Sequence, residues 1–432
     1  MLRIIKLFFF IIFPLAIANS QDLKTNKLKS TGNYYSEHQA FIKPNKTFLI
    51  KPDFEFNAIA IKAVTKDFEN SFAILGNDTI YFNKNDDYQP NDGFLLSDLI
   101  FSSTLVNNFK IFSGNIDGQI IIYLINGLPD QLTTEKITLL KNNFKSNKNQ
   151  LAFCMDPQSI DQSVWRAGLA PPDYDRVFTE VNHCIIHHAA GSNTDTDYTA
   201  VVRSYYILHT ETNGWSDIGY NYLIAQDGTI YKGRDPETGE QDNVRGAHFC
   251  GKNSNTMGIC ILGNYMEVEP PEAALNSLGE LLSWKLNKDG LDPFGTSYHV
   301  DRDLGTIAGH RNGCSTSCPG DYLYNLLGEI RQQVADSMVN CVTGLELISN
   351  NTDQILIYPN PTNGNNFNLN INPDFEINEI KMFDIGGKLI INKHINKQNK
   401  QINIETKNLK NGIYIIKLMG KNSVLTKKLI IR

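Results

Sequence analysis

The segment 308–320, AGHRNGCSTSCPG, constrains the fold most, because it places a histidine and a cysteine directly before a periodic apolar segment. The apolar residues that follow recur at helical spacing: Leu323, Leu326, Leu327, Ile330 and Val334. We therefore predict a helix that begins just after Cys318, with Pro319 near its first position. A sulfur at a helix N-terminus is favoured as a thiolate, and a thiolate beside a histidine is half of a zinc site. Taken alone, the segment fits a disulfide cysteine beside a surface histidine equally well.

The first twenty residues predict a signal peptide that is removed on export. Residues 1–6 give a short basic start, residues 7–13 an apolar core too short to span a bilayer comfortably, and residues 18–20 a small-residue cleavage pattern. The mature chain is expected to start near Gln21. No later apolar run reaches spanning length, so we expect no transmembrane segment in the mature chain.

The chain has 432 residues, more than one ordinary core holds, so we expect two or three domains. Its formal net charge of -6 argues against a nucleic-acid partner, and we expect a monomer. The predicted segments are a signal peptide at 1–20, a β-rich, sandwich-like module at 21–150, a central α/β domain at 151–342, a linker at 343–352 and a small β-sandwich at 353–432.

The seven cysteines would lie in an oxidising compartment after export, where disulfides persist. If Cys318 binds a metal, an even set remains: Cys154, Cys184, Cys250, Cys260, Cys314 and Cys341. This parity agrees with a special role for Cys318, although one buried thiol explains the odd number as well. A disulfide of Cys318 with Cys314 or Cys341 stays open.

The N-terminal module is predicted to be β-rich and without catalytic chemistry. Its short apolar runs are separated by Asn, Asp and Gly, a spacing typical of a sandwich: 56–61, 72–75 and 120–125. It has no cysteine, and His38 is its single histidine, so we expect no metal or nucleophile site there. A module that binds sugar or cell wall and a plain spacer both fit. The Lys- and Asn-rich residues 140–150 predict a solvated linker.

The central domain alternates predicted strands with predicted helices, which indicates an α/β domain with a mixed sheet and flanking helices. Strands are predicted at 215–224, 229–234 and 257–262, with a hairpin at Asp227-Gly228, and helices at 199–209 and from 270. The run VNHCIIHH is a buried strand that ends in two histidines. Period two places His187 and His188 on opposite faces, so one is a candidate ligand and the other lines the adjoining surface.

Together, His187, His310 and Cys318 supply two imidazoles and one thiolate. Three protein ligands leave the fourth tetrahedral position for water, which is the catalytic arrangement of zinc. Attack of that water on an amide carbonyl builds an oxyanion, and Tyr220 is a candidate to stabilise it or to pass a proton. Thr316, two residues before the cysteine, offers a hydroxyl at the same place.

Six motifs resemble the peptidoglycan recognition proteins, which belong with the zinc N-acetylmuramoyl-L-alanine amidases of the phage-lysozyme type. They are IIHHAA (185–190), GWSDIGY (214–220), DGTIYKGR (227–234), GAH (246–248), GICILGNY (258–265) and GHR with CPG (309–320). The resemblance spans about 164–327 in the family's order. It implies a zinc cofactor bound by His187, His310 and Cys318, with Tyr220 as the catalytic tyrosine.

The resemblance also implies finer roles and one departure. Thr316 matches the threonine common in animal amidases, and His188 and His248 fall on positions that line the groove for the peptide stem. Members that only bind peptidoglycan have usually lost the cysteine ligand, which this chain keeps. The cysteine pair that animal members carry after the double histidine is absent from 191–206. That loop must be held otherwise, and substrate preference does not carry over.

The C-terminal segment resembles the type A sorting domain recognised by the type IX secretion system of certain Gram-negative bacteria. The matching motifs are YPNPTNG (358–364), FDIGGK (383–388), NGIY (411–414) and KKLI (427–430). The resemblance implies export through the periplasm to the extracellular space or the outer cell surface, with the type IX machinery as a partner.

These observations lead us to expect a secreted zinc amidase that cuts the bond between the lactyl group of N-acetylmuramic acid and the first L-alanine of the stem. Two alternatives remain. One is a protein that binds peptidoglycan without cutting it, and the other is a surface adhesion protein with a vestigial amidase domain.

Overall fold

The computed structural model describes residues 20–85, 93–147, 154–342, 355–363, 366–371, 378–384, 388–395, 401–407, 409–419 and 424–431. The chain divides into two compact units, Met1–Ser337 and Met338–Arg432. The predicted signal peptide, apart from Ser20, and the predicted linker at 343–352 lie outside the described residues. No helix within the described ranges is long and apolar enough to cross a membrane.

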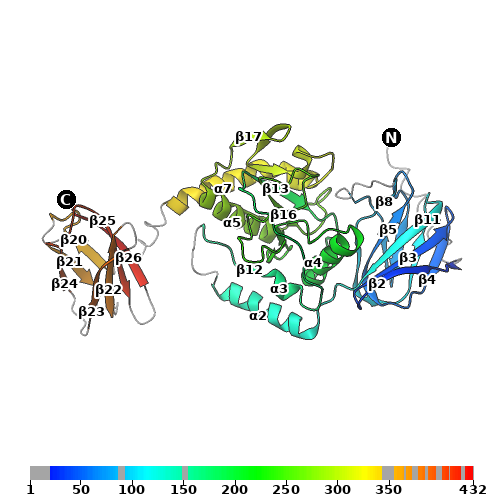
Figure 1. Ribbon diagram of the computed structural model, residues 1–432, viewed down its shortest axis with the longest axis horizontal. Helices are drawn as coiled ribbons and strands as arrows, with labels where there is room; N and C mark the ends of the chain where they lie inside the picture. Colours follow the sequence, from blue (N-terminus) through cyan, green and yellow to red (C-terminus); the bar gives the residue numbers. More distant parts are fainter. Residues whose placement is uncertain are drawn as a thin grey trace, which may run out of the picture. The chain divides into compact units, whose positions relative to one another are not determined.

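Two β-sheets form the N-terminal part of the first unit (Figure 1). The five-stranded sheet has the order β1-β4-β10-β6-β7, and the six-stranded sheet has the order β2-β3-β11-β5-β8 with β9 paired to β5. The strands are β1 Gln21–Asp22, β2 Asn26–Thr31, β3 Tyr35–Ile42, β4 Thr47–Ile50, β5 Phe56–Ala63, β6 Phe72–Leu75, β7 Asp78–Tyr81, β8 Leu95–Leu96, β9 Ile100–Val106, β10 Phe109–Phe112 and β11 Gly118–Ile125.

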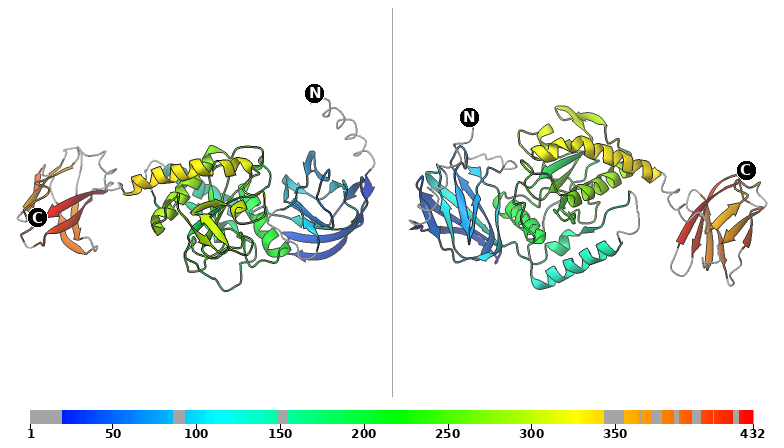
Figure 2. Two further views of the ribbon diagram at one scale, coloured as in Figure 1. Left: turned by 90° about the horizontal axis from the view of Figure 1, so that it is seen from above. Right: turned by 180° about the vertical axis from the view of Figure 1, so that it is seen from behind.

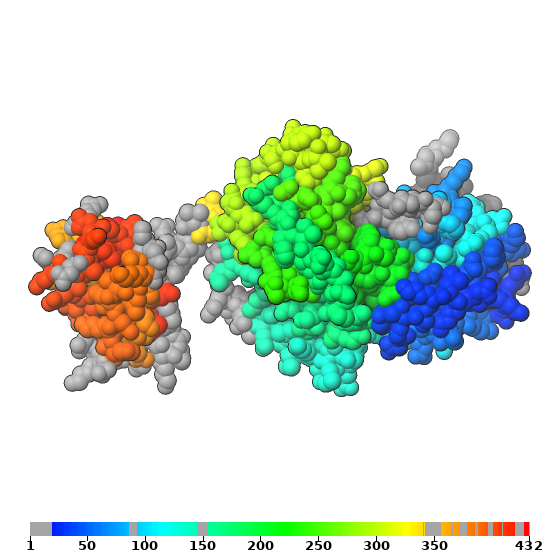
Figure 3. Space-filling view, viewed as in Figure 1, coloured from blue at the N-terminus to red at the C-terminus, as the bar shows by residue number. Residues whose placement is uncertain are grey.

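Strands β5 and β11 of the six-stranded N-terminal sheet are buried on both faces, whereas its edge strand β2 is exposed. Along β5, Ile59 and Ile61 belong to the hydrophobic cluster shared with the five-stranded sheet. Their neighbours Ala58 and Ala60 point to the other face, where they join a cluster that includes helix α4 (Tyr198–Ile207) of the central domain. Figure 2 shows this sheet beside the central domain, and in Figure 3 the blue N-terminal residues meet the green residues of the central domain. Burial on both faces explains why β5 and β11 are apolar at nearly every position.

Helix α2 (Gln131–Asn147) corrects the predicted solvated linker at 140–150 as far as residue 147. Ile137 is buried in the cluster that also holds α4, and Phe144 packs against that cluster. These two side chains are seven residues apart, so they lie on one face of a helix. Their burial outweighs the local content of Lys and Asn.

The central domain contains a six-stranded mixed sheet of order β12-β15-β14-β16-β13-β19, which confirms the predicted α/β class. Its strands are β12 Ser159–Ile160, β13 His183–His188, β14 Tyr222–Ile224, β15 Ile230–Lys232, β16 Thr256–Ile261 and β19 Ile307–Gly309. Strands β14 and β15 are antiparallel, as the hairpin prediction requires, and the other pairs are parallel. Parallel strands end at the same edge of a sheet, so β13 and β19 deliver the residues that follow them to one place.

The other elements of the first unit cover this sheet or extend from it. They are α3 Gln162–Trp165, α4 followed by a π-helical turn Leu208–Thr212, α5 Glu272–Asp289, the hairpin β17 Thr296–His299 and β18 Arg302–Gly305, a 3-10 turn His310–Asn312, α6 Asp321–Asn325 and α7 Leu327–Val342. The strand predicted at 215–224 is observed only at its end, as β14.

The helix predicted directly after Cys318 begins three residues later, at Asp321. Gly320 stands before it with a φ of 88°, a left-handed conformation that favours glycine, so the chain turns before the helix starts. The apolar periodicity is divided between α6 and α7, and Leu323 and Val334 are both fully buried. Cys318 therefore lies outside the first helical turn.

The second unit contains two β-sheets, in agreement with the predicted β-rich C-terminal domain. One has the order β20-β21-β24 and the other β23-β22-β25-β26. The strands are β20 Ile355–Tyr358, β21 Asn366–Ile371, β22 Glu379–Asp384, β23 Leu389–His394, β24 Gln401–Glu405, β25 Gly412–Met419 and β26 Val424–Ile431. Residues of both sheets, such as Phe367 and Ile416, share one hydrophobic cluster.

Candidate metal centre

His187, His310 and Cys318 come together at the edge where β13 and β19 end. One potential ligand atom from each lies within 4.8 Å of the others, and all three side chains are buried. The strand register explains the meeting of the two histidines, because Ile186 pairs with Gly309 and the following residues are His187 and His310. Cys318 arrives on the turn before α6. The structure therefore brings the three predicted ligands to one locus.

The separation of His187 Nδ1 and Cys318 Sγ fits two ligands of one zinc ion. His187 Nδ1 lies 3.7 Å from Cys318 Sγ. Zinc binds nitrogen at about 2.0–2.1 Å and sulfur at about 2.3 Å, so a tetrahedral angle separates the two ligand atoms by about 3.6 Å. Cys318 is a thiol, which excludes the disulfide that the sequence left open for it. Two imidazoles and one thiol form a donor set that suits zinc.

His248 is buried and contacts the His187 ring. His187 Nε2 is 3.0 Å from His248 Nδ1. His248 Nε2 is 3.3 Å from Thr256 Oγ1, which donates to the Asn253 carbonyl at 2.9 Å. When Nδ1 of His187 is reserved for a metal, its Nε2–H must donate to His248 Nδ1, and His248 Nε2–H then donates to Thr256. The chain of hydrogen bonds fixes one tautomer of each ring.

Two glycines hold the His248 ring in this position. A Cβ on Gly246 would lie 2.6 Å from its Cδ2, and a Cβ on Gly258 would lie 2.5 Å from the same atom. Both distances are shorter than any ordinary contact, so only glycine permits the ring to lie there. His248 is 5% exposed, which places it among the buried residues. The motifs GAH and GICILGNY thus meet around one side chain.

Tyr220 lies beside the cluster, as predicted. Its ring centroid is 5.2 Å from that of His187, and the side chain is 4% exposed. Gly219 allows the close approach of this segment, because a Cβ there would lie 2.7 Å from the Ala247 carbonyl oxygen. The Gly219 N–H donates to His209 Nδ1 at 3.2 Å, which fixes the turn before the tyrosine.

Thr316 and His188 flank the cluster in different ways. The Thr316 hydroxyl oxygen accepts a hydrogen bond from the Cys318 N–H at 3.0 Å, so it stabilises the turn that carries the cysteine. His188 Nδ1 accepts from the Tyr265 N–H at 3.2 Å on the opposite face of β13 from His187. The two histidines therefore lie on opposite faces of β13 and contact different residues, as the period of the strand predicts.

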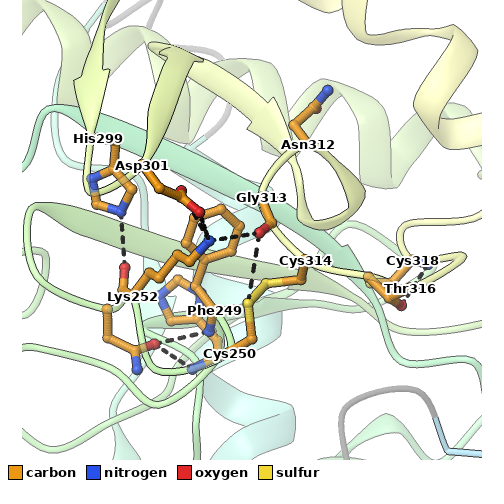
Figure 4. The surroundings of a disulfide bond; sticks show 12 residues. Phe249, Cys250, Lys252, His299, Asp301, Asn312, Gly313, Cys314, Thr316 and Cys318 are labelled. Carbon is orange, nitrogen blue, oxygen red and sulfur yellow. Dashed lines mark hydrogen bonds and ion pairs between the residues drawn. A yellow bond between two sulfur atoms is a disulfide. The ribbon is translucent and has the colours of Figure 1, made fainter.

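A disulfide between Cys250 and Cys314 joins the two loops that carry the site (Figure 4). Cys250 follows His248 by two residues, and Cys314 precedes Cys318 by four. The bond therefore ties the His248 loop to the turn of the cysteine ligand. The pairing of the six cysteines was left open at the level of sequence, so this pair was not predicted.

Not all of the six cysteines other than Cys318 are paired in disulfides. Cys154 and Cys341 are disulfide-bonded, like Cys250 and Cys314, whereas Cys184 and Cys260 remain thiols together with Cys318. Cys184 and Cys260 lie on the buried strands β13 and β16, where they pack as small apolar side chains. Burial raises the pKa of the Cys184 thiol to about 12.

The loop after the double histidine, which lacks the cysteine pair, is held by the amide side chain of Asn193 and by Tyr205. Asn193 Nδ2 donates to the Asn264 carbonyl at 2.8 Å, and its Oδ1 accepts from the Asn264 N–H at 2.8 Å. Tyr205 adds a hydrogen bond from its hydroxyl to the Ala189 carbonyl at 2.7 Å. These contacts answer how the loop after the double histidine is fixed without a disulfide.

Asp217 organises the turn that leads to Tyr220. Its carboxylate accepts hydrogen bonds from the Ile218 and Asp235 N–H groups and from Gln162 Nε2, at 2.7, 2.8 and 2.8 Å. Burial raises the pKa of Asp217 to about 6, although the Asp235 and Ile218 N–H groups and nearby Arg234 act in the lowering direction. The sequence analysis did not single out this residue.

Two segments of the chain match known families. Residues 177–321 match the family described as N-acetylmuramoyl-L-alanine amidase, and residues 356–432 match the secretion system C-terminal sorting domain. The sorting domain indicates secretion by the type IX system.

Curated relatives match the same central region. Peptidoglycan-recognition protein SC2 of Drosophila melanogaster is 32% identical over 168 residues, which are 38% of this chain and 82% of that protein. Peptidoglycan recognition protein 1 of Bos taurus is 33% identical over 171 residues, 39% of this chain and 81% of that protein. The Homo sapiens N-acetylmuramoyl-L-alanine amidase is 37% identical over 135 residues, 31% of this chain and 21% of that protein.

Proposed function

This chain belongs to the N-acetylmuramoyl-L-alanine amidase family that includes the peptidoglycan recognition proteins, and we propose on that premise that it is a zinc-dependent amidase. Its substrate is the amide between N-acetylmuramic acid and the first L-alanine of peptidoglycan. The observation that carries the proposal is the buried meeting of His187, His310 and the thiol of Cys318. Binding of peptidoglycan alone does not require such a donor set.

His187, His310 and Cys318 would hold the zinc ion. When bound, zinc supplies a water of lowered pKa and polarises a carbonyl oxygen. The Tyr220 phenol, beside the His187 ring, donates a hydrogen bond to the oxyanion that develops on the scissile carbonyl, or passes a proton to the leaving amine. The Thr316 hydroxyl holds the Cys318 turn through the Cys318 N–H, so its part in the reaction is to position the thiolate.

His248 acts as a positioning residue in this proposal. Its Nδ1 accepts from His187 Nε2, and that bond orients the ligand ring and raises its basicity. The role of His248 as a groove-lining residue stays a prediction beside this one, and the contact with His187 Nε2 is what supports the positioning role. His188, on the opposite face of β13, keeps its predicted role in binding the substrate.

We propose that the mature protein acts outside the cell that makes it. We propose that the signal peptide at 1–20 directs it to the periplasm and that the sorting domain, placed at 353–432, takes it across the outer membrane. We place the amidase domain at 151–342, and the matched segment 177–321 lies inside these limits.

The decisive experiment compares the wild type with Cys318→Ala on purified peptidoglycan, with zinc quantified in each protein. We expect the release of new L-alanine amino termini to fall more than about 100-fold and the zinc content to drop in Cys318→Ala. Cys184→Ala is the matched control, because it removes another buried thiol that touches no predicted ligand, and it should keep both properties. Wild-type protein that holds zinc and binds peptidoglycan without releasing amino termini would identify a non-catalytic binder.

A further inference from the structure

The six-stranded N-terminal sheet is fixed against the central domain by close contacts as well as by the shared hydrophobic cluster. Arg203 Nε donates to the Gly127 carbonyl at 2.8 Å. A Cβ on Gly127 would lie 2.5 Å from the Ala200 carbonyl oxygen, so only glycine allows the approach. Glu211 accepts hydrogen bonds from Lys29 Nζ at 2.6 Å and from Thr31 Oγ1 at 2.9 Å. The N-terminal strands therefore hold a set position beside the site.

A cavity of about 500 Å³ lies between these two parts of the first unit. Residues between the N-terminal strands, namely Asn83, Lys84 and Asp98, contribute to its lining, and the central domain contributes His188, Asn193 and Glu267 among others. Ser317, directly before the cysteine ligand, also lines it. The cavity is adjacent to the predicted metal ligands, because the His188 carbonyl oxygen is 3.8 Å from Cys318 Sγ.

The lining combines polar groups of both signs, because it holds the carboxyl groups of Asp98 and Glu267 and the ammonium group of Lys84. The amide side chain of Asn83 can both donate and accept hydrogen bonds. Among the described lining residues, Lys84 brings the single ammonium group, and it is exposed. A stem peptide carries carboxylates on its glutamate and at its end, whereas the amide that is cut lies at its sugar-linked end. A stem that extends from the metal site into this cavity would bring a carboxylate to Lys84.

We propose that the N-terminal region, through residues that lie between its strands, forms one wall of the substrate site and that Lys84 pairs with a carboxylate of the stem peptide. This inference rests on the proposed function for its substrate class. It gives the N-terminal region a role in recognition, where the sequence left a sugar-binding module and a plain spacer as equal interpretations.

The test uses the full chain with three substitutions: Lys84→Glu, Lys84→Arg and Lys66→Glu. Lys66 is an exposed lysine that follows β5 and does not line the cavity, so Lys66→Glu controls for the change in net charge. The hydrolysis assay uses a muramyl-peptide with free stem carboxylates and the same compound with those carboxylates amidated. A sedimentation assay measures the binding of each protein to insoluble peptidoglycan in a Cys318→Ala background.

We expect Lys84→Glu to raise the KM for the free-carboxylate substrate and to weaken sedimentation by about five- to tenfold. Lys84→Arg and Lys66→Glu should stay within about twofold of wild type. Amidation should raise the wild-type KM by a similar factor and should make the KM insensitive to Lys84→Glu. Equal behaviour of Lys84→Glu and Lys66→Glu in both assays would overturn the inference.

The binding assay separates this inference from the proposed function. Wild-type protein that releases no amino termini, but whose binding to peptidoglycan is weakened by Lys84→Glu alone, would refute the amidase and keep the recognition wall. Full turnover with no effect of Lys84→Glu on KM or on binding would keep the amidase and refute the recognition wall.

Discussion

Replacement of His248 by phenylalanine tests how the structure orients a metal ligand. Phenylalanine keeps a flat ring between Gly246 and Gly258 but removes the atom that accepts from His187 Nε2. The His187 N–H is then left in an apolar, buried space. We expect His248→Phe to weaken zinc binding while the fold is retained.

The size of the effect follows from that one hydrogen bond. The two nitrogens are 3.0 Å apart in a buried site. A buried donor that loses its partner costs about 1–3 kcal/mol, and each 1.4 kcal/mol is about a tenfold change in affinity. The expected loss of zinc affinity is therefore roughly 10- to 100-fold, which is the range typical of residues that orient a metal ligand.

The assay is competition for zinc with a chromophoric chelator at fixed neutral pH, together with kcat/KM on a muramyl-peptide. His248→Gln offers an acceptor from a side chain of similar reach and should recover part of the affinity. His183→Phe is the matched control. His183 is a buried histidine on β13, the strand that carries His187, and it contacts Gly305 and Ser297 instead of a predicted ligand.

Zinc affinity of His248→Phe within about twofold of wild type would refute the reasoning, since the lost bond would then contribute nothing to the orientation of His187. An equal loss in His248→Phe and His183→Phe would also refute it, because the effect would then reflect general destabilisation of the strand. A loss confined to His248→Phe, with recovery in His248→Gln, supports the positioning role.

Two further predictions concern stability. Because burial raises the pKa of Asp217 to about 6, above its ordinary 3.8, the folded state binds more protons than the unfolded state between these values, and this group's contribution to stability falls as the pH rises through that window. The unfolding free energy of wild type minus that of Asp217→Asn should therefore decline by on the order of 3 kcal/mol from about pH 4 to about pH 7, measured by urea denaturation, and a flat difference would contradict it. Replacement of Cys250 and Cys314 by serine removes a disulfide between residues that are 64 positions apart, and it should lower the unfolding free energy by about 2–4 kcal/mol. Thermal denaturation with and without a reductant measures that cost, and an unchanged midpoint in the double variant would count against the bond as a brace of the site.

The predicted strands and the three predicted ligands show what local pattern can reveal. A run such as 120–125 is apolar at every position, and the structure places it on β11, buried on both faces. Such an uninterrupted apolar run indicates a strand that is buried on both faces, but from it we predicted only a sandwich. The linker prediction at 140–150 was wrong as far as residue 147, because Phe144 of α2 packs against a cluster whose other members are distant in the chain.

The sequence by itself determined which side chains of this protein could bind a metal, and the period of the strand separated His187 from His188. Those inferences need only residue type and local spacing. The tertiary structure decided which atoms His248 contacts, the pairing of Cys250 with Cys314, and which N-terminal residues line the cavity with Lys84. Each of these depends on contacts between segments that are 50 or more residues apart, such as His187 and His248, which are separated by 61 residues. Such contacts are set by how the sheets pack, and no local pattern of residues encodes that packing.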